Sequence, residues 1–282
     1  MRFVIEPDAT AFAPRGLAWM ERDAVLNTLP ATIVRTRMAG LPAGDTGPPL
    51  WITVESDHGE VIGAAVRTPP RAVVLPAIPP DIAAGLADFV HELPTAQELP
   101  GITGPVAQAS AFADQWAALT DCGVHTHTRM RLYRMAELVP PPAERGSWRL
   151  ADESDFDLCF DWFVDFPAAA GHKTGPPAEA ADVRERLAGR RIGLWEIDGE
   201  PVSLAGWTLS ASGVVRVGPV YTPRRHQRHG YGTAATAAAT AGILATGAEA
   251  CLFTDLNNPT SNSIYQKIGY RPVADFVEFV FG

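Results

Sequence analysis

A short basic segment stands directly before a glycine pair in the second half of the chain. It reads VYTPRRHQRHGYG from Val220 to Gly232, and a run of Ala and Thr follows it. Glycine lets an anion approach the backbone, and the first N–H groups of a helix have no partner within the helix. With the side chains of Arg224, Arg225 and Arg228, such a helix start could seat a pyrophosphate group. The alternative is a glycine-capped surface turn with solvated arginines.

Two common nucleotide-binding motifs fit this segment poorly. A Walker loop needs Gly-Lys-Ser or Gly-Lys-Thr, which the chain lacks. The segment GYGTAA from Gly230 matches the dinucleotide pattern G-x-G-x-x-A, but a seven-residue basic loop separates it from the preceding strand. Only 50 residues follow Gly232, too few for the rest of a dinucleotide domain. A nicotinamide-dependent oxidoreductase is therefore disfavoured.

A second motif follows downstream, in LFTDLNNPTSNSIYQKIGYRPV from Leu252 to Val273. Its pattern predicts a strand, a polar turn, a short helix and another strand. The two motifs together resemble those of the GNAT superfamily of acetyl-CoA-dependent N-acyltransferases, which pairs Q/R-x-x-G-x-G/A with N-x-x-[AS]-x-x-[IL]-Y-x-x-x-G-[FY]. The resemblance covers about residues 147–282. The matching positions are Gln227, Gly230, Gly232, Asn258, Ser261, Ile264, Tyr265, Gly269 and Tyr270.

The resemblance implies that a strand over Val214–Thr222 lies along the pantetheine arm of acetyl-CoA. Pro219, which would meet the arm, has no N–H group, so Val220 and Tyr221 are the available backbone donors. One of these two N–H groups would polarise the thioester carbonyl.

The resemblance also implies that the basic loop and the helix start bind the cofactor. Arg228 stands where many members of the family have glycine. Asn258 would hold the cofactor, although an Asx turn before Pro259 is an equal alternative. The loop and helix residues expected to bind are Gln227, Arg228, His229, Gly230, Tyr231, Gly232 and Thr233.

The reaction implied is direct attack of an amine on the thioester, with Tyr265 as the general acid that protonates the departing thiolate. The alternative is that Tyr265 only packs beside Ile264 and Ile268. Many members of the family carry a glutamate on the fourth strand as general base, whereas this strand offers only Arg216. Apart from a chain of water molecules, the other candidates for a base are Asp255, Asp165 and His172.

A proline-rich segment, ELVPPPAERGS, divides the chain, and its three consecutive prolines favour an extended spacer. We predict a degenerate GNAT-like lobe over 1–138, a linker over 139–147 and an acetyl-CoA-binding GNAT domain over 148–282. Both lobes show a Leu-Trp strand, a Gly-Glu turn, further strands and a helix, which indicates an internal duplication of a mixed α/β fold. The first lobe has Asp81 and no glycine pair at the equivalent helix start, so we expect it not to bind acetyl-CoA.

Composition excludes other classes of function. The 282 residues carry a formal net charge of −9 with scattered basic residues, which argues against nucleic acid as a partner. No apolar run approaches the roughly 18 residues of a membrane span, and the N-terminus lacks a signal pattern. We therefore expect a cytoplasmic protein without membrane association. His226 and His229 have H-x-x-H spacing but lie in the basic loop, where phosphate contact or solvent exposure is favoured over metal binding, and the same holds for His125 and His127. The three cysteines lack the spacing of a metal site and are expected to be buried free thiols.

The sequence thus favours an N-acetyltransferase with one active site in the C-terminal lobe. A non-catalytic acyl-CoA-binding or regulatory protein of the same fold is the alternative. The acceptor would be a small-molecule or peptide amine, and a homodimer is left open. The segment Phe160–Gly175 is expected to line the acceptor site, where Asp161 and Asp165 would attract a cation.

Overall fold

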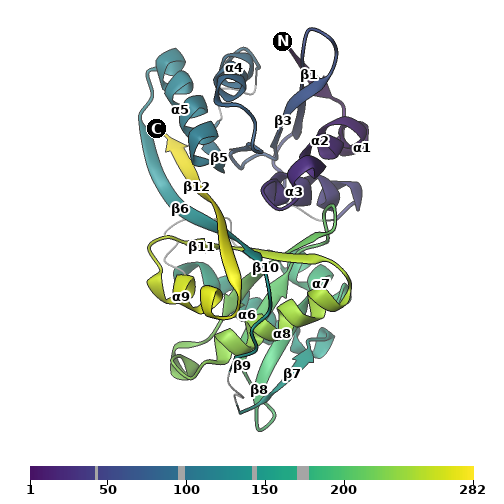
Figure 1. Cartoon of the computed structure of the whole chain (residues 1–282), viewed down its shortest axis with the longest axis vertical. Coiled ribbons are helices and arrows are strands. Elements are labelled where there is room, and N and C mark those ends of the chain that lie inside the picture. Colours follow the sequence, from purple (N-terminus) through teal and green to yellow (C-terminus); the bar gives the residue numbers. More distant parts are fainter. Residues whose placement is uncertain (42–43, 95–98, 142–144, 170–177) are drawn as a thin grey trace. The chain divides into compact units, whose positions relative to one another are not determined.

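The computed structural model describes residues 1–41, 44–94, 99–141, 145–169 and 178–282 (Figure 1). The chain forms two compact units. Unit 1 comprises Met1–Arg131 and Ala274–Gly282, and unit 2 comprises Leu132–Val273. Strands β6 (Val124–Met135) and β12 (Tyr270–Phe281) each begin in one unit and end in the other. The mixed α/β class is confirmed, and the predicted lobe boundaries of 1–138, 139–147 and 148–282 stay a prediction, with 142–144 outside the described residues.

Unit 1 is a sheet covered by helices. Its strands follow the order β1 (Arg2–Glu6), β2 (Leu50–Glu55), β3 (Val61–Arg67), β4 (Val73–Val74), β5 (Gly101–Pro105) and the end of β12. Only β4 and β5 pair in parallel among these neighbours. The helices are α1 (Ala9–Phe12), α2 (Ala18–Met20), α3 (Thr28–Met38), α4 (Pro80–His91) and α5 (Val106–Thr120).

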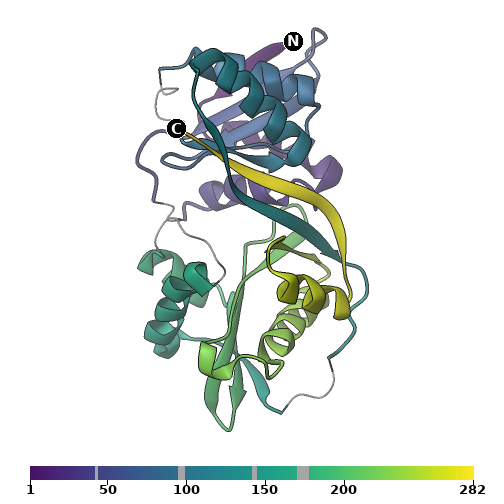
Figure 2. The ribbon, with the colours of Figure 1, turned by 90° about the vertical axis from the view of Figure 1, so that its left-hand side faces the viewer.

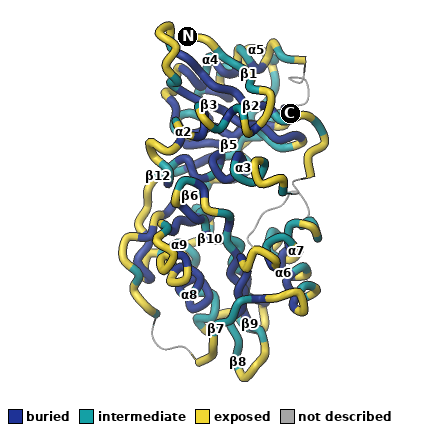
Figure 3. The backbone as a smooth tube through the Cα atoms, turned by 90° about the vertical axis from the view of Figure 1, so that its right-hand side faces the viewer, coloured by how far each residue is buried: buried dark blue, intermediate teal, exposed yellow. Residues whose placement is uncertain are grey.

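The core of unit 1 follows from helical periodicity. Ile82, Leu86 and Val90 recur every four residues along α4 and are buried, so one stripe of the helix packs on the sheet. Phe112 and Trp116 provide the equivalent stripe on α5. The central strands of the sheet are buried and the turns between them are largely exposed (Figure 3).

Unit 2 contains the strand order β11-β10-β9-β8-β7. The strands are β7 (Ser147–Leu150), β8 (Ile192–Ile197), β9 (Glu200–Trp207), β10 (Val214–Tyr221) and β11 (Glu249–Asp255). All neighbours are antiparallel except β10 and β11. Helices α6 (Phe156–Ala169) and α7 (Ala180–Ala188) cover one face, and α8 (Tyr231–Ala245) and α9 (Pro259–Lys267) cover the other (Figure 2, Figure 3).

Local sequence explains how these helices are placed. Asp152 accepts a hydrogen bond from the Ser154 N–H in a capping box that leads into α6. Arg149 on β7 then binds Asp155 through two hydrogen bonds of 2.6 and 2.8 Å, and Glu196 on β8 through one of 2.6 Å. The start of α6 is thereby fixed to the sheet.

On the other face, α8 consists mostly of Ala and Thr. Ala235 and Ala239 are fully buried, so this helix lies close against β9 and β10.

The sequence predicted most elements of the second half and fewer of the first. Within residues 72–80 only Val73–Val74 are a strand, because Pro76, Pro79 and Pro80 cannot donate to a ladder. Helices α1, α2, α3 and α5 were not predicted. Asp8, which accepts a hydrogen bond from Ala11 N, is a start signal for α1 that was overlooked, whereas α2, α3 and α5 begin without a side-chain cap. No helix in the described ranges has the length and apolar character needed to cross a membrane.

Candidate active site

Strands β10 and β11 form a fork. They pair in parallel over only three residues each, Val214–Arg216 with Glu249–Cys251. Beyond Arg216 the pairing of β10 with β9 shifts between Val217 and Val220, at Gly218–Pro219. Because Pro219 has no N–H group, a regular ladder could not continue here.

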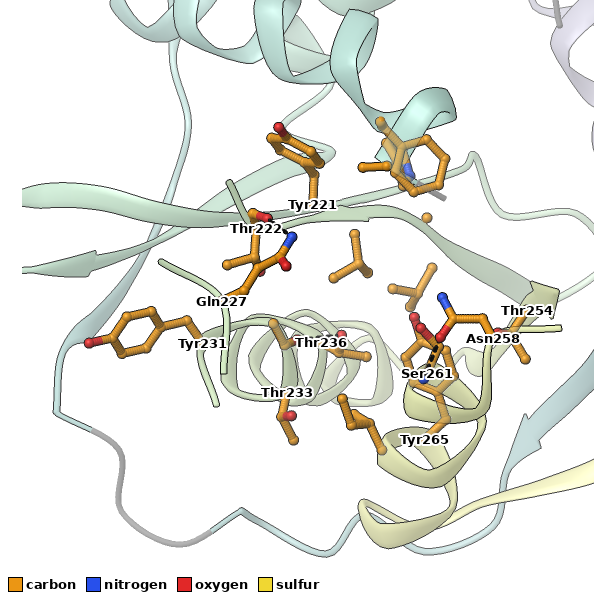
Figure 4. Close-up of a pocket in the computed structure, with 18 of the residues that line it drawn as sticks. Tyr221, Thr222, Gln227, Tyr231, Thr233, Thr236, Thr254, Asn258, Ser261 and Tyr265 are labelled. Atoms are coloured by element: carbon orange, nitrogen blue, oxygen red, sulfur yellow. Dashed lines mark hydrogen bonds between the residues drawn. The ribbon is translucent and has the colours of Figure 1, made fainter. Parts of the chain in front are cut away.

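A cavity of about 540 Å³ lies at this fork (Figure 4). Its walls come from the open part of β10, the end of β11, the loop after β10, the start of α8, helix α9 and the end of α6. All predicted site residues except His229 line it. They are Pro219, Val220, Tyr221, Gln227, Arg228, Gly230, Tyr231, Gly232, Thr233, Asn258 and Tyr265.

Strand alternation decides which backbone donor faces the fork. On β9, the Trp207 N–H donates to the backbone O of Arg191, just before β8. Every second residue of a strand directs its backbone N–H and C=O to the same neighbouring strand, so Ala205, two residues earlier, also directs these groups toward β8. Val220 lies opposite Ala205, and its N–H and C=O therefore point away from β9. Tyr221 lies opposite Leu204, and its backbone N–H and C=O therefore point toward β9. Of the two expected donors, Val220 is the one whose N–H is directed into the fork.

The start of α8 presents unpaired donors to the cavity. Gly230 caps the helix with φ of 80°, and Ala234 makes the first intrahelical bond, donating its N–H to Gly230 O at 3.0 Å. The N–H groups of Tyr231, Gly232 and Thr233 therefore have no acceptor within the helix. A Cβ on Gly232 would lie 3.1 Å from Thr222 Oγ1, so a larger residue here would have to displace the Thr222 hydroxyl slightly.

The basic loop is ordered by its own contacts. Gln227 Nε2 donates to Thr222 O at 3.0 Å, which ties the loop to the end of β10. Arg228 has φ of 67°, in the left-handed region that favours glycine. Burial and the neighbouring Arg225 lower the pKa of His226. The His229 ring stacks on the Tyr231 ring with centroids 5.5 Å apart, and His229 does not line the cavity.

Helix α9 carries the predicted proton donor. Asn258 Oδ1 accepts a hydrogen bond from Ser261 N at 3.0 Å, so its side chain caps the start of α9. Asn258 also lines the cavity. Burial raises the pKa of Tyr265 to about 12, against the opposing effect of a hydrogen bond with Ser261. The Tyr265 ring meets the edge of Tyr270 with centroids 6.1 Å apart. Tyr265 is therefore protonated throughout the neutral range.

The candidate bases lie in different places. Asp255 lines the cavity at the end of β11, where its Oδ1 accepts a hydrogen bond from Asn257 N at 2.7 Å. Asp165 is exposed on α6 and accepts a hydrogen bond from the Tyr221 hydroxyl at 3.2 Å. His172 and the part of Phe160–Gly175 beyond Ala169 lie outside the described residues.

Several cavity residues were missed from the sequence. Thr236 lies one helical turn after Gly232, so the periodicity of α8 could have revealed it. Phe166 and Ala169 belong to the segment Phe160–Gly175, which the sequence was expected to place at the acceptor site, and both line the cavity. The other lining residues that were not among the expected binding residues are Val217, Gly218, Thr222, His226, Phe253, Thr254, Ser261 and Ile264.

The described residues contain no group of three His, Cys, Asp or Glu side chains that could hold a metal ion. His125 and His127 lie on β6. The three cysteines, Cys122, Cys159 and Cys251, are free thiols, and burial raises the pKa of Cys159 to about 12.

Known proteins share this architecture. Residues 191–278 match the model of the FR47-like protein family. A GNAT-family acetyltransferase from Colwellia psychrerythraea is similar over 100% of both chains, with a TM-score of 0.63 and 11% identity. A GCN5-related N-acetyltransferase from Sphaerobacter thermophilus has a TM-score of 0.64 and 15% identity over 99% of this chain and 95% of its own.

A tandem GNAT protein of the clavulanic acid biosynthesis pathway is similar over 100% of this chain and 98% of its own, with a TM-score of 0.60 and 15% identity. No curated protein matches the chain in sequence. The GNAT-like fold predicted from the sequence, in the arrangement of a tandem protein, is confirmed.

Proposed function

We propose that this chain, whose fold is that of the GNAT acetyltransferases, transfers an acetyl group from acetyl-CoA directly to an amine, at one active site in unit 2. The observation that carries the proposal is the fork, because an open pair of strands exposes backbone groups that a closed ladder would consume. A cavity of about 540 Å³ at the fork joins these groups to the positive end of a helix.

The start of α8 suits the pyrophosphate of coenzyme A. Three adjacent N–H groups, of Tyr231, Gly232 and Thr233, lack helical acceptors, and Arg228 is among the residues that line the same cavity. Gly232 keeps this wall accessible, since a methyl group there would crowd Thr222. These residues fit a bound phosphate by charge, by donors and by space.

Acetyl-CoA would supply the acetyl group as an activated thioester. The Val220 N–H, directed into the fork, would hold the thioester oxygen and favour negative charge on it. Tyr265, protonated because burial raises its pKa to about 12, would donate the proton that the leaving sulfur needs. The acceptor is a small-molecule or peptide amine.

A non-catalytic acyl-CoA-binding protein is the second candidate. It is favoured by β10 itself, which carries Arg216 and no carboxylate that could act as a base. An enzyme would need its base on another element. Among the described residues that line the cavity, Asp255 at the end of β11 is the carboxylate that could take this role.

One experiment separates the two functions. The protein is mixed with acetyl-CoA and a panel of amines, and free thiol is measured together with the calorimetric affinity for acetyl-CoA and for NAD. We expect acetyl-CoA binding and amine-dependent thiol release. Tight acetyl-CoA binding without thiol release for any amine would support the binding protein instead. Affinity for NAD without affinity for acetyl-CoA would overturn both candidates.

A further inference from the structure

The cavity opens toward two faces of the sheet in unit 2. Arg228, Tyr231 and Gly232 line it from the side of α8, and Phe166 and Ala169 line it from the side of α6. Phe166 and Ala169 therefore belong to a different wall from the residues at the start of α8, and under the proposed function the side near α6 would receive the acceptor.

Tyr221 connects β10 to α6 at this end. The shift in register at Gly218–Pro219 changes the alternation of β10, so that Tyr221 packs with Trp162 and Phe163 of α6 while Val220 packs toward α8. Figure 4 shows Tyr221 projecting away from Thr233 and Thr236 of α8. The side chain of Tyr221 is thus available for a role other than contact with the cofactor.

The Tyr221 hydroxyl is held by a carboxylate. It donates to Asp165 Oδ2 at 3.2 Å, and its ring lies 5.8 Å from that of Trp162. Burial and the charge of Asp165 raise the pKa of Tyr221, so this hydroxyl keeps its proton. Asp165 is exposed and is not itself among the lining residues, whereas its partner Tyr221 and the next residue, Phe166, both line the cavity. A charged carboxylate next to an apolar wall is a suitable partner for an ammonium group.

We propose that the Asp165 carboxylate, oriented by the Tyr221 hydroxyl, binds and positions the amino group of the acceptor at the α6 end of the cavity. This inference rests on the proposed function and names its substrate class. The acceptor is a primary amine on an apolar, preferably aromatic, group. It carries no carboxylate next to the amine, because Asp165 would repel one.

Binding is tested without acetyl-CoA, by calorimetric titration with 2-phenylethylamine, its neutral analogue 2-phenylethanol and the amino acid phenylalanine. We expect the amine to bind about fivefold or more tightly than either analogue, the difference that one partly exposed charge pair supports. Asp165→Asn should remove this preference. Tyr221→Phe, which keeps the backbone N–H, should weaken amine binding and add little to Asp165→Asn in the double variant.

Asp157→Asn is the matched control. Asp157 is also exposed on α6, eight residues and therefore about 12 Å before Asp165 along the axis. This variant should bind the amine as the unchanged protein does, and thermal unfolding of every variant reports whether it is folded. Equal affinity for amine and alcohol, or equal effects of Asp165→Asn and Asp157→Asn, would overturn the proposal.

Turnover is then measured with the same amine and acetyl-CoA. For Asp165→Asn, we expect KM for the amine to rise about fivefold or more with little change in kcat or in acetyl-CoA affinity. Amine binding with the expected selectivity but without acetyl transfer would refute the proposed function and leave Asp165 as an amine-binding residue. Transfer that is indifferent to Asp165 would refute only the role of this residue.

Discussion

Tyr265 lies where a proton donor to the departing thiolate would be needed, because it lines the cavity. Burial raises its pKa to about 12, which keeps the hydroxyl protonated but also makes it a weaker acid than a solvated tyrosine. Tyr265→Phe should lower kcat by about 100-fold, the lower end for loss of a general acid, while acetyl-CoA affinity measured by calorimetry stays unchanged. Unchanged kcat would show that Tyr265 only packs between α9 and Tyr270.

The same burial has a consequence for stability at high pH. Because the pKa of Tyr265 is raised in the folded state, the unfolded chain releases this proton first as pH rises above the ordinary value near 10. Stability should therefore fall between about pH 10 and 12. In urea unfolding, Tyr265→Phe should show a shallower fall over this window than the unchanged protein. Identical slopes would mean that Tyr265 is solvated in the folded state.

The positive charge of Arg228 favours anion binding, whereas its backbone conformation favours glycine at this position. Its φ of 67° is one that a glycine adopts freely. Arg228→Gly should stabilise the fold by about 1 kcal/mol, which raises Tm by roughly 2–3 °C for a chain of this size, and should weaken acetyl-CoA binding through loss of the cation. Arg224→Gly is the comparison, because Arg224 is not at positive φ. That variant should lower Tm, and a fall for Arg228→Gly as well would remove the strain argument.

Residue types predicted which residues line the cavity from α8 and α9 better than they predicted the contacts between β10 and α6. Gly230, Gly232 and Tyr265 stand in local spacings that a single sequence displays, and the structure brings them to one cavity. The bond between Tyr221 and Asp165 joins residues 56 positions apart. It depends on how α6 packs and on a register shift in β10, which sequence spacing does not encode.

At the scale of elements, binding of acetyl-CoA would require that the fork and the start of α8 both keep their geometry. Gly232→Ala and Gly242→Ala test this on one helix. Gly242 is exposed, with no atom within 4 Å of a new Cβ, so alanine there should add about 0.5–1 kcal/mol of stability through helix propensity. At Gly232 the same methyl group would crowd Thr222 and the anion path. Calorimetry should show weaker acetyl-CoA binding for Gly232→Ala and unchanged binding for Gly242→Ala.

The outcome that contradicts this view is unchanged acetyl-CoA affinity in Gly232→Ala.

The sequence predicted the elements involved, since the strand over Val214–Thr222 and the helix after Gly230 were both expected and both form. Pro219 signalled a broken ladder in advance. The place where β10 leaves β11, after Arg216, could not be predicted, because a parallel register is set by packing on both faces.

At the scale of the whole molecule, the described strands of unit 1 stay paired at the position that corresponds to the fork. After β4, Leu75 N continues the pairing with β5 by donating to Thr103 O at 2.8 Å, and a Cβ on Gly104 would lie 3.1 Å from that of Leu75. Ile78 is buried, and Gln108 Nε2 donates to its carbonyl oxygen at 2.7 Å. These contacts use backbone groups of Leu75 and Ile78 that an open strand would leave for a ligand.

The helix start in unit 1 is equally unsuited to an anion. Pro80 provides no N–H in the first turn of α4, and Asp81 adds a negative charge there. We therefore expect calorimetry to give one acetyl-CoA per chain. A stoichiometry of two would show that unit 1 opens in solution and that its lobe is not degenerate.

The paths of β6 and β12 mean that no single chain cleavage yields two independent proteins. A cut within 139–147 leaves the start of unit 2, from Leu132 to the cut, on the first fragment and Ala274–Gly282 of unit 1 on the second. Phe276 and Val277, buried against unit 1, would lose their cover in an isolated second fragment. A protease site engineered into this segment should therefore give two fragments that elute together, and each half expressed alone should aggregate.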